Sequence, residues 1–328
     1  MPERRNAFFR RTLPVLGLLI ATAAAGCATR NTVAFMLDRG QSNFRFARLA
    51  GADLRGRNLA GKNFFGADLS GADLSGADLT GARLRSADLR KAVLKGAVLK
   101  NADLASARLY KADFRDAVLA GAVLHGADCI MARLTEADCT GVDFSDADLS
   151  GADLARANMT NANFGGAVFF GADVSGGNLS GVNLNDAKLY FASLRGGDFT
   201  TARLDRSDFR NAGLSGCSFR KVRLSNSLLS GADFTGSDLR EADLTGANLD
   251  GADLGAANLT GADLSGADLS GASLKRTNLA GAKLKGAKVN RKYLPLLQSQ
   301  AVDFSRVVWV ETRERKEGEG GNPAPSEK

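Results

Sequence analysis

The stretch GADLSGADLSGADLTG at residues 66–81 repeats a unit of five residues, and the same period runs from Phe44 to Val289. Every fifth position in this range carries Leu, Phe or a similar apolar residue, and the phase does not slip over 50 consecutive positions. Ala usually stands two residues before this central position, and Asp or Asn often stands between them. The central residues that are neither Leu nor Phe are all apolar: Cys129, Cys139, Met159, Val174 and Val289.

A period of five fits neither regular element. On a helix, five residues advance about 500°, so successive central residues would point in different directions around the axis. On a straight strand, five is odd, so successive central residues would point to opposite faces. The apolar residues share one core only if the chain bends by a similar amount in every pentad. Regular bends make a coil, and stacked coils make a solenoid.

The unit resembles that of the pentapeptide repeat family, which reads approximately Ala-(Asp/Asn)-Leu-X-Gly and stands here as ADLSG at 72–76 and ADLTG at 77–81. The resemblance covers about three-quarters of the chain. It implies an all-β fold, a right-handed quadrilateral β-helix with four pentads per coil. The central residue and the small residue two before it would point inward, and the other three outward. Fifty pentads then predict about 12 coils, with small terminal caps.

The N-terminus predicts export from a bacterial cytoplasm. Residues 1–26 contain four arginines followed by an apolar run, Leu13 to Ala25, that is too short for a stable membrane anchor. Ala24-Ala25-Gly26-Cys27 resembles a bacterial lipoprotein cleavage box, although that family prefers Leu at the place of Ala24. The resemblance implies that Cys27 is lipidated and begins the mature chain. Alternatives are ordinary cleavage in the Ala-rich run, with release of a soluble protein, and a twin-arginine reading of Arg4-Arg5.

The composition shifts divide the chain into five parts. We expect a signal peptide at 1–26, a tether and N-terminal cap at 27–43, and the repeat β-helix at 44–294. A C-terminal cap follows at 295–310, and a disordered tail at 311–328. Val33 to Leu37 could cover the first coil. Near the other end, Tyr293 to Ser299 could form a short helix and Arg306 to Val310 a strand, with Trp309 covering the last coil.

Catalytic and metal-binding arrangements are hard to build from this sequence. His125 is the one histidine, and it is predicted to point outward without partners. Cys129, Cys139 and Cys217 occupy inward positions, where thiols serve as small hydrophobes. The Asp rows lack the glycine-rich nonapeptide of calcium-binding β-rolls, and we expect them to be solvated. We therefore predict no enzyme activity, no cofactor and no metal.

The charge does not favour nucleic acid as a partner. The formal net charge is +7, but residues 1–26 contribute +3, which leaves +4 on the remaining chain. The outward Asp residues are interleaved with Lys and Arg, which is typical of a solvated surface. One basic band could attract an acidic partner, anionic headgroups or glycan, although a solvated band is the simpler interpretation. It comprises Arg85, Arg90, Lys91, Lys95, Lys100, Lys111 and Arg115, beside Val93, Val98, Val118 and Val123 in place of outward Asp.

Positions twenty residues apart should stack in vertical columns if a coil holds four pentads. Two neighbouring columns, just after a row of central residues, then contain several apolar side chains. Exposed apolar patches rimmed by polar residues often mark interfaces. The simpler alternative is drift from the consensus, since single exposed apolar residues are common. The candidate interaction face consists of Tyr110, Ile130, Met131, Phe170, Tyr190 and Phe191, bounded by Arg90 and Arg210.

These patterns predict a binding or scaffold protein, held by lipid at the periplasmic or outer-membrane face of a bacterial envelope. The partner is a protein or a second copy of the chain, and we expect neither nucleic acid nor a small-molecule substrate. A second hypothesis uses an activity known in the family, in which some members mimic DNA and bind gyrase. That role needs a cytoplasmic location and an acidic rod, and both conflict with this sequence.

Overall fold

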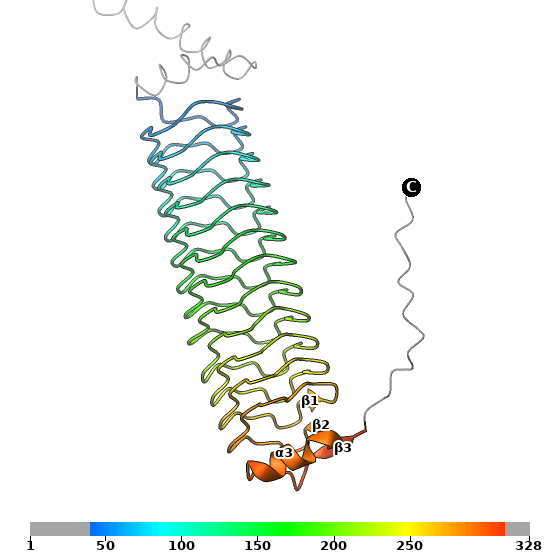
Figure 1. Ribbon diagram of the computed structural model, residues 1–328. Coiled ribbons are helices and arrows are strands. Elements are labelled where there is room, and N and C mark those ends of the chain that lie inside the picture. Colours follow the sequence, from blue (N-terminus) through cyan, green and yellow to red (C-terminus); the bar gives the residue numbers. More distant parts are fainter. Residues whose placement is uncertain (1–39, 312–328) are drawn as a thin grey trace, which may run out of the picture.

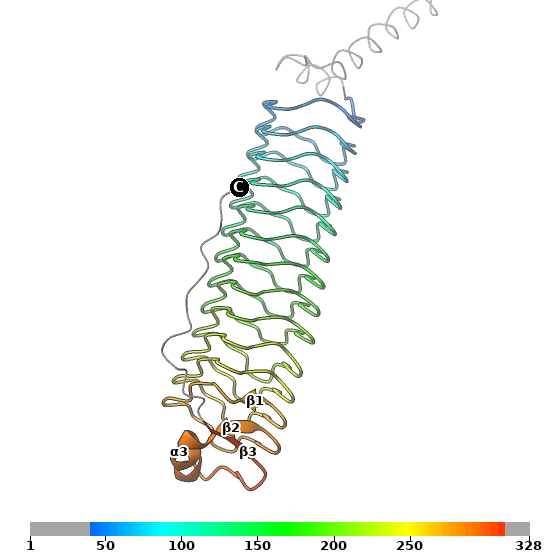
Figure 2. The same ribbon diagram turned by 90° about the vertical axis from the view of Figure 1, so that its right-hand side faces the viewer.

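The computed structural model describes residues 40–311, which form one continuous rod of stacked coils (Figures 1 and 2). Parallel bridges join residues twenty positions apart, from Asn43 with Asn63 to Asp263 with Lys283. Strand β1 (Asp268–Leu269) pairs in the same register with β2 (Lys288–Asn290), and β2 pairs with β3 (Val308–Val310). Four pentads therefore complete one coil, as the columns in the sequence require.

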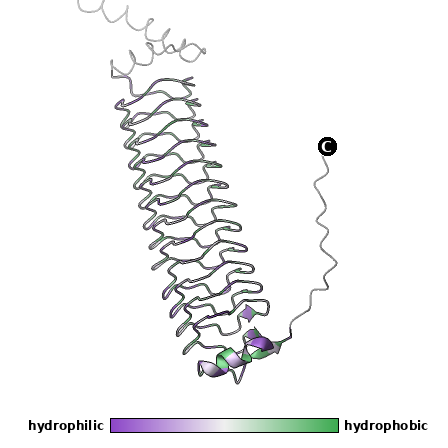
Figure 3. Ribbon diagram, in the orientation of Figure 1, coloured by the Kyte–Doolittle hydropathy of each residue, from purple (hydrophilic) through white to green (hydrophobic). Residues whose placement is uncertain are grey.

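Each coil contributes two buried residues per pentad to a narrow core. Leu154 is fully buried, and the exposed fraction of Ala152 is 1%. Identical positions stack along the axis, so that the rings of Phe144 and Phe164 lie parallel with centroids 5.1 Å apart. The outward residues between them give the alternation of polar and apolar positions seen in Figure 3. The predicted inward and outward assignment is confirmed by this burial.

The corner between pentads is a tight turn. The amide of Ala52 donates to the carbonyl of Leu49 at 3.0 Å, and Gly51 has φ of +64°. A left-handed φ at the third residue is the geometry of a type II turn, which explains the frequent Gly. Lys91 and Met131 occupy the same place with φ of 58° and 56°, so the stacked coils hold even residues with side chains in this conformation.

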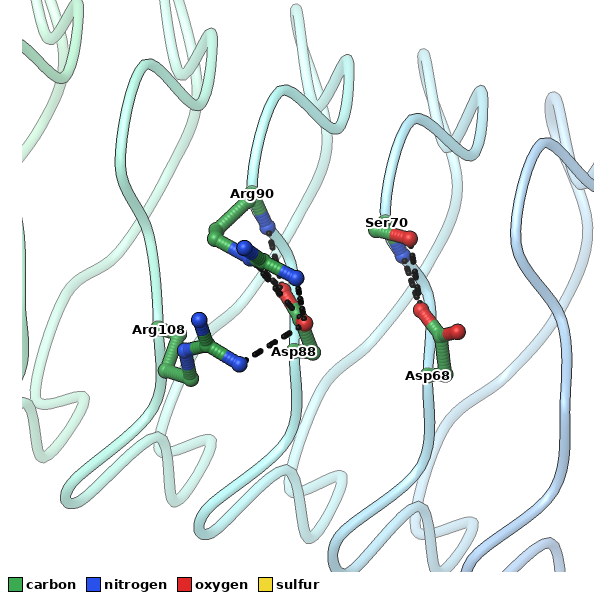
Figure 4. Close-up of polar contacts among 5 residues, drawn as sticks. All are labelled: Asp68, Ser70, Asp88, Arg90 and Arg108. Carbon is green, nitrogen blue, oxygen red and sulfur yellow. Dashed lines mark hydrogen bonds and ion pairs between the residues drawn. The ribbon is translucent and has the colours of Figure 1, made fainter.

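The Asp and Asn before the central residue have a structural role that the sequence analysis missed. Asp68 Oδ1 accepts from the amide of Ser70 at 3.0 Å and from its hydroxyl at 2.6 Å (Figure 4). Asp153 likewise accepts from the amide of Ala155 at 3.1 Å. These amides belong to the second residue of the turn, as the bonds from Ala72 to Leu69 and from Ala157 to Leu154 show. The prediction that the Asp rows are merely solvated was therefore wrong, because many of these side chains hold the turn through Asx-type bonds.

Small polar residues at inward positions find partners in the preceding coil. The hydroxyls of Ser237 and Thr277 donate to the carbonyls of Leu214 and Leu254 at 2.6 and 2.8 Å. Cys217 Sγ similarly lies 3.0 Å from the carbonyl of Leu194. A buried hydroxyl costs little stability when it is hydrogen-bonded, so these substitutions keep the core intact.

The repeat ends at Val289 and is followed by a 3-10 helix η1 (Arg291–Tyr293) and a helix α3 (Leu294–Ser299). The expected boundary after residue 294 thus falls inside this helical segment. The amide of Leu274 donates to the Tyr293 hydroxyl at 3.0 Å, and the amide of Leu279 donates to Gln300 Oε1. Leu297 is buried, and Trp309 pairs with Val289. Backbone amides of the last coil therefore have partners from outside the repeat.

The predicted signal peptide, Cys27, Val33 to Leu37 and the tail after residue 311 lie outside the described residues. Within 40–311, none of the helices has the length and apolarity that crossing a bilayer requires.

Candidate functional site

Three aromatic residues of the candidate face form one exposed cluster. Phe170 and Tyr190 occupy the same place on adjacent coils, with ring centroids 5.1 Å apart. Phe191 contacts both rings edge to face, at 6.0 and 6.4 Å. The exposed fractions of Phe170 and Phe191 are 48% and 59%, although such rings are ordinarily among the most buried side chains. We call these three residues the aromatic cluster.

The remaining apolar residues of the face form a second, smaller group. Met131 is 48% exposed, whereas Tyr110 and Ile130 are half-buried. The coil that carries Ser150 and Gly151 separates this group from the aromatic cluster, and the Met131 side chain leans over Gly151. The six residues lie along one edge of the rod, as the columns predict, but they form two groups and not one continuous strip.

The arginines predicted to bound the face are ion-paired. Arg90 binds Asp88 at 2.6 Å, and Arg210 binds Asp208 at 2.7 Å. Each pair joins residues two positions apart, which point to the same side of the chain (Figure 4). Both arginine side chains keep about half of their surface exposed, so they can still form the polar rim of an interface.

One exposed apolar residue two coils beyond the aromatic cluster was missed. Leu228 is 41% exposed, and it replaces the usual Asp in the column that also contains Val168 and Lys188. Val93, Val98, Val118 and Val123 were noted at such Asp positions, but Leu228 was not. Comparing this column along its whole length would have found Leu228.

The charge along the rod alternates in sign around the aromatic cluster. Residues 128–187 contain nine Asp or Glu and two Arg, whereas residues 188–223 contain eight Lys or Arg and three Asp. Residues 224–274 are again acidic, with eight Asp or Glu and one Arg. The aromatic cluster therefore lies at a boundary between an acidic and a basic section.

The pentapeptide repeat family matches this chain in 8 copies that run from residue 42 to residue 291. The chain is a pentapeptide repeat protein. Its right-handed β-helix is the fold that the family indicates. No functionally curated protein matches the chain.

Several solved pentapeptide repeat structures are similar. HetL from the cyanobacterium Nostoc sp. strain PCC 7120, which is involved in heterocyst differentiation regulation, is 30% identical over 77% of this chain and 95% of its own, with a TM-score of 0.21. The plasmid-mediated fluoroquinolone resistance protein QnrB1 is 18% identical over 70% and 95%, with a TM-score of 0.34. A thylakoid lumen protein of Arabidopsis thaliana is 28% identical over 40% and 72%, with a TM-score of 0.20.

The reactive side chains of this pentapeptide repeat protein are dispersed or buried. Cys129, Cys139 and Cys217 are buried thiols without disulfides, and burial raises the pKa of Cys139 and of Cys217 to about 12. Within residues 40–311, no three His, Cys, Asp or Glu side chains are grouped to hold a metal ion. His125 points outward as predicted, but the prediction that it has no partner was wrong. Its Nδ1 lies 2.9 Å from Ser145 Oγ and 3.8 Å from Asp146.

Part of the basic band is neutralised by neighbouring carboxylates. Arg115 binds Asp113 at 2.6 Å, and Lys95 lies 3.8 Å from Asp116. Lys111 instead lies over the ring of Tyr110, 5.2 Å from its centroid. These contacts favour the interpretation of a solvated band over a dedicated anion site.

The ion pairs predict an acid-sensitive rod. Hydrogen bonds from Arg115 and Arg240 lower the pKa of Asp113 and of Asp238, against the opposing effect of burial. A lowered pKa in the folded state stabilises the protein above the unfolded pKa of about 3.9, and this stability is lost as pH falls through the folded pKa. We expect the melting temperature to decrease when the pH is lowered below about 4. The decrease should be smaller in the Asp113→Asn variant. Melting curves between pH 6 and pH 2 test this, and identical slopes for both proteins would contradict it.

Proposed function

We propose that this pentapeptide repeat protein is a non-enzymatic binding or scaffold protein that presents the aromatic cluster to a protein partner. The observation that carries the proposal is the exposure of Phe170 and Phe191 in mutual contact with Tyr190. Aromatic side chains supply large contact areas and are enriched at interfaces. Pentapeptide repeat proteins are generally structural or binding proteins, which agrees with this role.

We further propose that the rod is held at a bacterial envelope membrane by lipid on Cys27, after removal of residues 1–26. The basic start, the short apolar run and Ala-Gly-Cys support this proposal. Release as a soluble envelope or secreted protein is the alternative. In either case a rigid rod would hold its binding surface at a fixed distance from its N-terminal end.

We also propose that residues 291–310 act as the C-terminal cap of about 12 coils. The bonds from the amides of Leu274 and Leu279 to Tyr293 and Gln300 support this role. An open end would expose such amides to strand addition by another chain.

The triple variant Phe170→Ser, Tyr190→Ser, Phe191→Ser tests the binding face. Truncating one aromatic anchor typically costs about 1–2 kcal/mol of binding, so the triple variant should bind its partner at least about tenfold more weakly. The fold should survive, because all three side chains point outward. Crosslinking pull-down of full-length protein and circular dichroism measure the two effects.

The matched control is Phe46→Ser, Phe65→Ser, which removes another outward ring pair, with centroids 5.5 Å apart, on a different edge. It should keep every partner. If the triple variant also keeps every partner and its oligomeric state, the exposed rings are drift from the consensus and the proposal fails.

A gyrase-binding DNA mimic is the second candidate. It would place the protein in the cytoplasm, and the alternating charge sections do not form the uniformly acidic rod that such a mimic needs. Finding the protein unlipidated in the cytoplasm would favour this candidate.

A further inference from the structure

We propose that the aromatic cluster binds a second copy of this chain in an antiparallel dimer, with the twofold axis between the coils of Phe170 and Tyr190. This inference rests on the proposed function, because it names the partner of the same surface. In an antiparallel pair of rods related by such an axis, each column of one chain faces the same column of the other in reverse order.

The column formed by the third residue of each turn on this edge, at residues 91, 111, 131 and every twentieth residue after them, fits this arrangement. Its members from residue 91 to residue 271 are either glycines or residues with a side chain, and the twofold axis places every side chain opposite a glycine. The facing pairs are Lys91 with Gly271, Lys111 with Gly251, Met131 with Gly231, Asn211 with Gly151, and Phe191 with Gly171. Glycine lets the backbone of a neighbour approach closely, and the place beside Gly171 is open for the projecting Phe191. The side chains of Met131, Asn211 and Asp250 lean over Gly151, Gly231 and Gly271, so the open fit lies at the twofold axis.

The register is specific to one coil. A shift by one coil would place Phe191 opposite Phe191 of the second copy, or Met131 opposite Asn211. In the proposed register Phe191 enters an open site, because no atom beyond the chain neighbours of Gly171 lies within 4 Å of where its Cβ would be.

The aromatic residues come together at the twofold axis. Phe170 of one copy faces Tyr190 of the other, and both Phe191 rings lie beside them. Six rings would then form one cluster at the centre of the contact, where the residues that dominate binding usually lie. The paired Arg210 faces Ser150 at the border of this cluster.

The charges are complementary in this register. In the columns that face each other, residues 88–91 and 108–111 carry four Lys or Arg and one Asp, a net charge of +3. They face residues 248–251 and 268–271, whose charged residues are two Asp, so that the exposed Asp250 faces Tyr110 beside Lys111. Opposite potentials favour the antiparallel orientation and fix its register.

Site-specific disulfide crosslinking tests the register. Full-length copies with different tags are co-expressed, one with Ile130→Cys and the other with Ser230→Cys, and then oxidised. These positions face each other across the twofold axis. Ser270→Cys replaces Ser230→Cys as the matched control, since it lies two coils away, or about 10 Å, beyond the Cα separation of about 7 Å that a disulfide spans. Cys129, Cys139 and Cys217 are buried and should not react.

We expect the 130–230 pair to crosslink at least tenfold more than the 130–270 pair or two Ile130→Cys copies. Adding the triple Ser change of the aromatic cluster should lower this yield at least tenfold. Absence of the 130–230 crosslink, equal yields, or a yield that the triple change does not affect would overturn the dimer. If the dimer fails but the triple variant loses a different bound protein, the proposed function stands. If the triple variant loses nothing, both fail.

Discussion

Leu154→Asp is expected to destroy the central coils of the rod. Leu154 is fully buried between the preceding and following coils, and each side of a coil contributes only one large side chain to the core. An unpaired carboxylate there has no donor to satisfy it, so the change should cost several kcal/mol. Because each coil contacts only its neighbours, the damage should spread outward from residue 154. Urea unfolding and local hydrogen exchange measure this loss.

Asp153→Asn is the matched control, one residue away. Its side chain accepts from the amide of Ala155, and Asn can accept the same bond, as Asn158 does for Thr160. Thr135 donates to the other oxygen, Oδ2, at 2.7 Å. In Asn the amide nitrogen takes this place and can donate to the Thr135 hydroxyl, as Asn158 does to Thr140. The change should therefore alter stability by no more than about 0.5 kcal/mol. Equal unfolding midpoints for Leu154→Asp and Asp153→Asn would show that the inward and outward assignment is wrong.

The core could be predicted from the sequence because burial follows directly from the period. Ala152 and Leu154 recur in phase with the bends, so no other pair of columns could form an apolar interior. The role of Asp153 could not be predicted in this way. A solvated carboxylate and one that bonds to a turn amide occupy the same outward position, and only the backbone geometry distinguishes them.

The candidate site could be predicted from the sequence as far as it depends on which residues stack in the same or neighbouring columns. Phe170, Tyr190 and Phe191 meet because a coil has twenty residues, and this follows from four pentads. The ion pair of Arg210 with Asp208 was not foreseen, although residues two apart on an extended chain share a side. Leu228 was missed because it is a single apolar residue at an Asp position, whereas Val93, Val98, Val118 and Val123 recur close together.

Cys27→Ser is expected to move the protein from the membrane fraction to the soluble fraction. Membrane affinity from lipid grows by about 0.8 kcal/mol per buried methylene group, so loss of the acylated thiol should remove the anchor entirely. Metabolic labelling with a lipid precursor and carbonate extraction of membranes measure this change. Cys217→Ala is the matched control, because Cys217 is a buried thiol at a position where Ala is the usual residue. An unmodified Cys27 in a parent protein that already fractionates as soluble would end the anchor proposal. A soluble protein in the periplasm could still use the aromatic cluster for binding. A soluble protein in the cytoplasm would instead favour the second candidate function, a DNA mimic that binds gyrase.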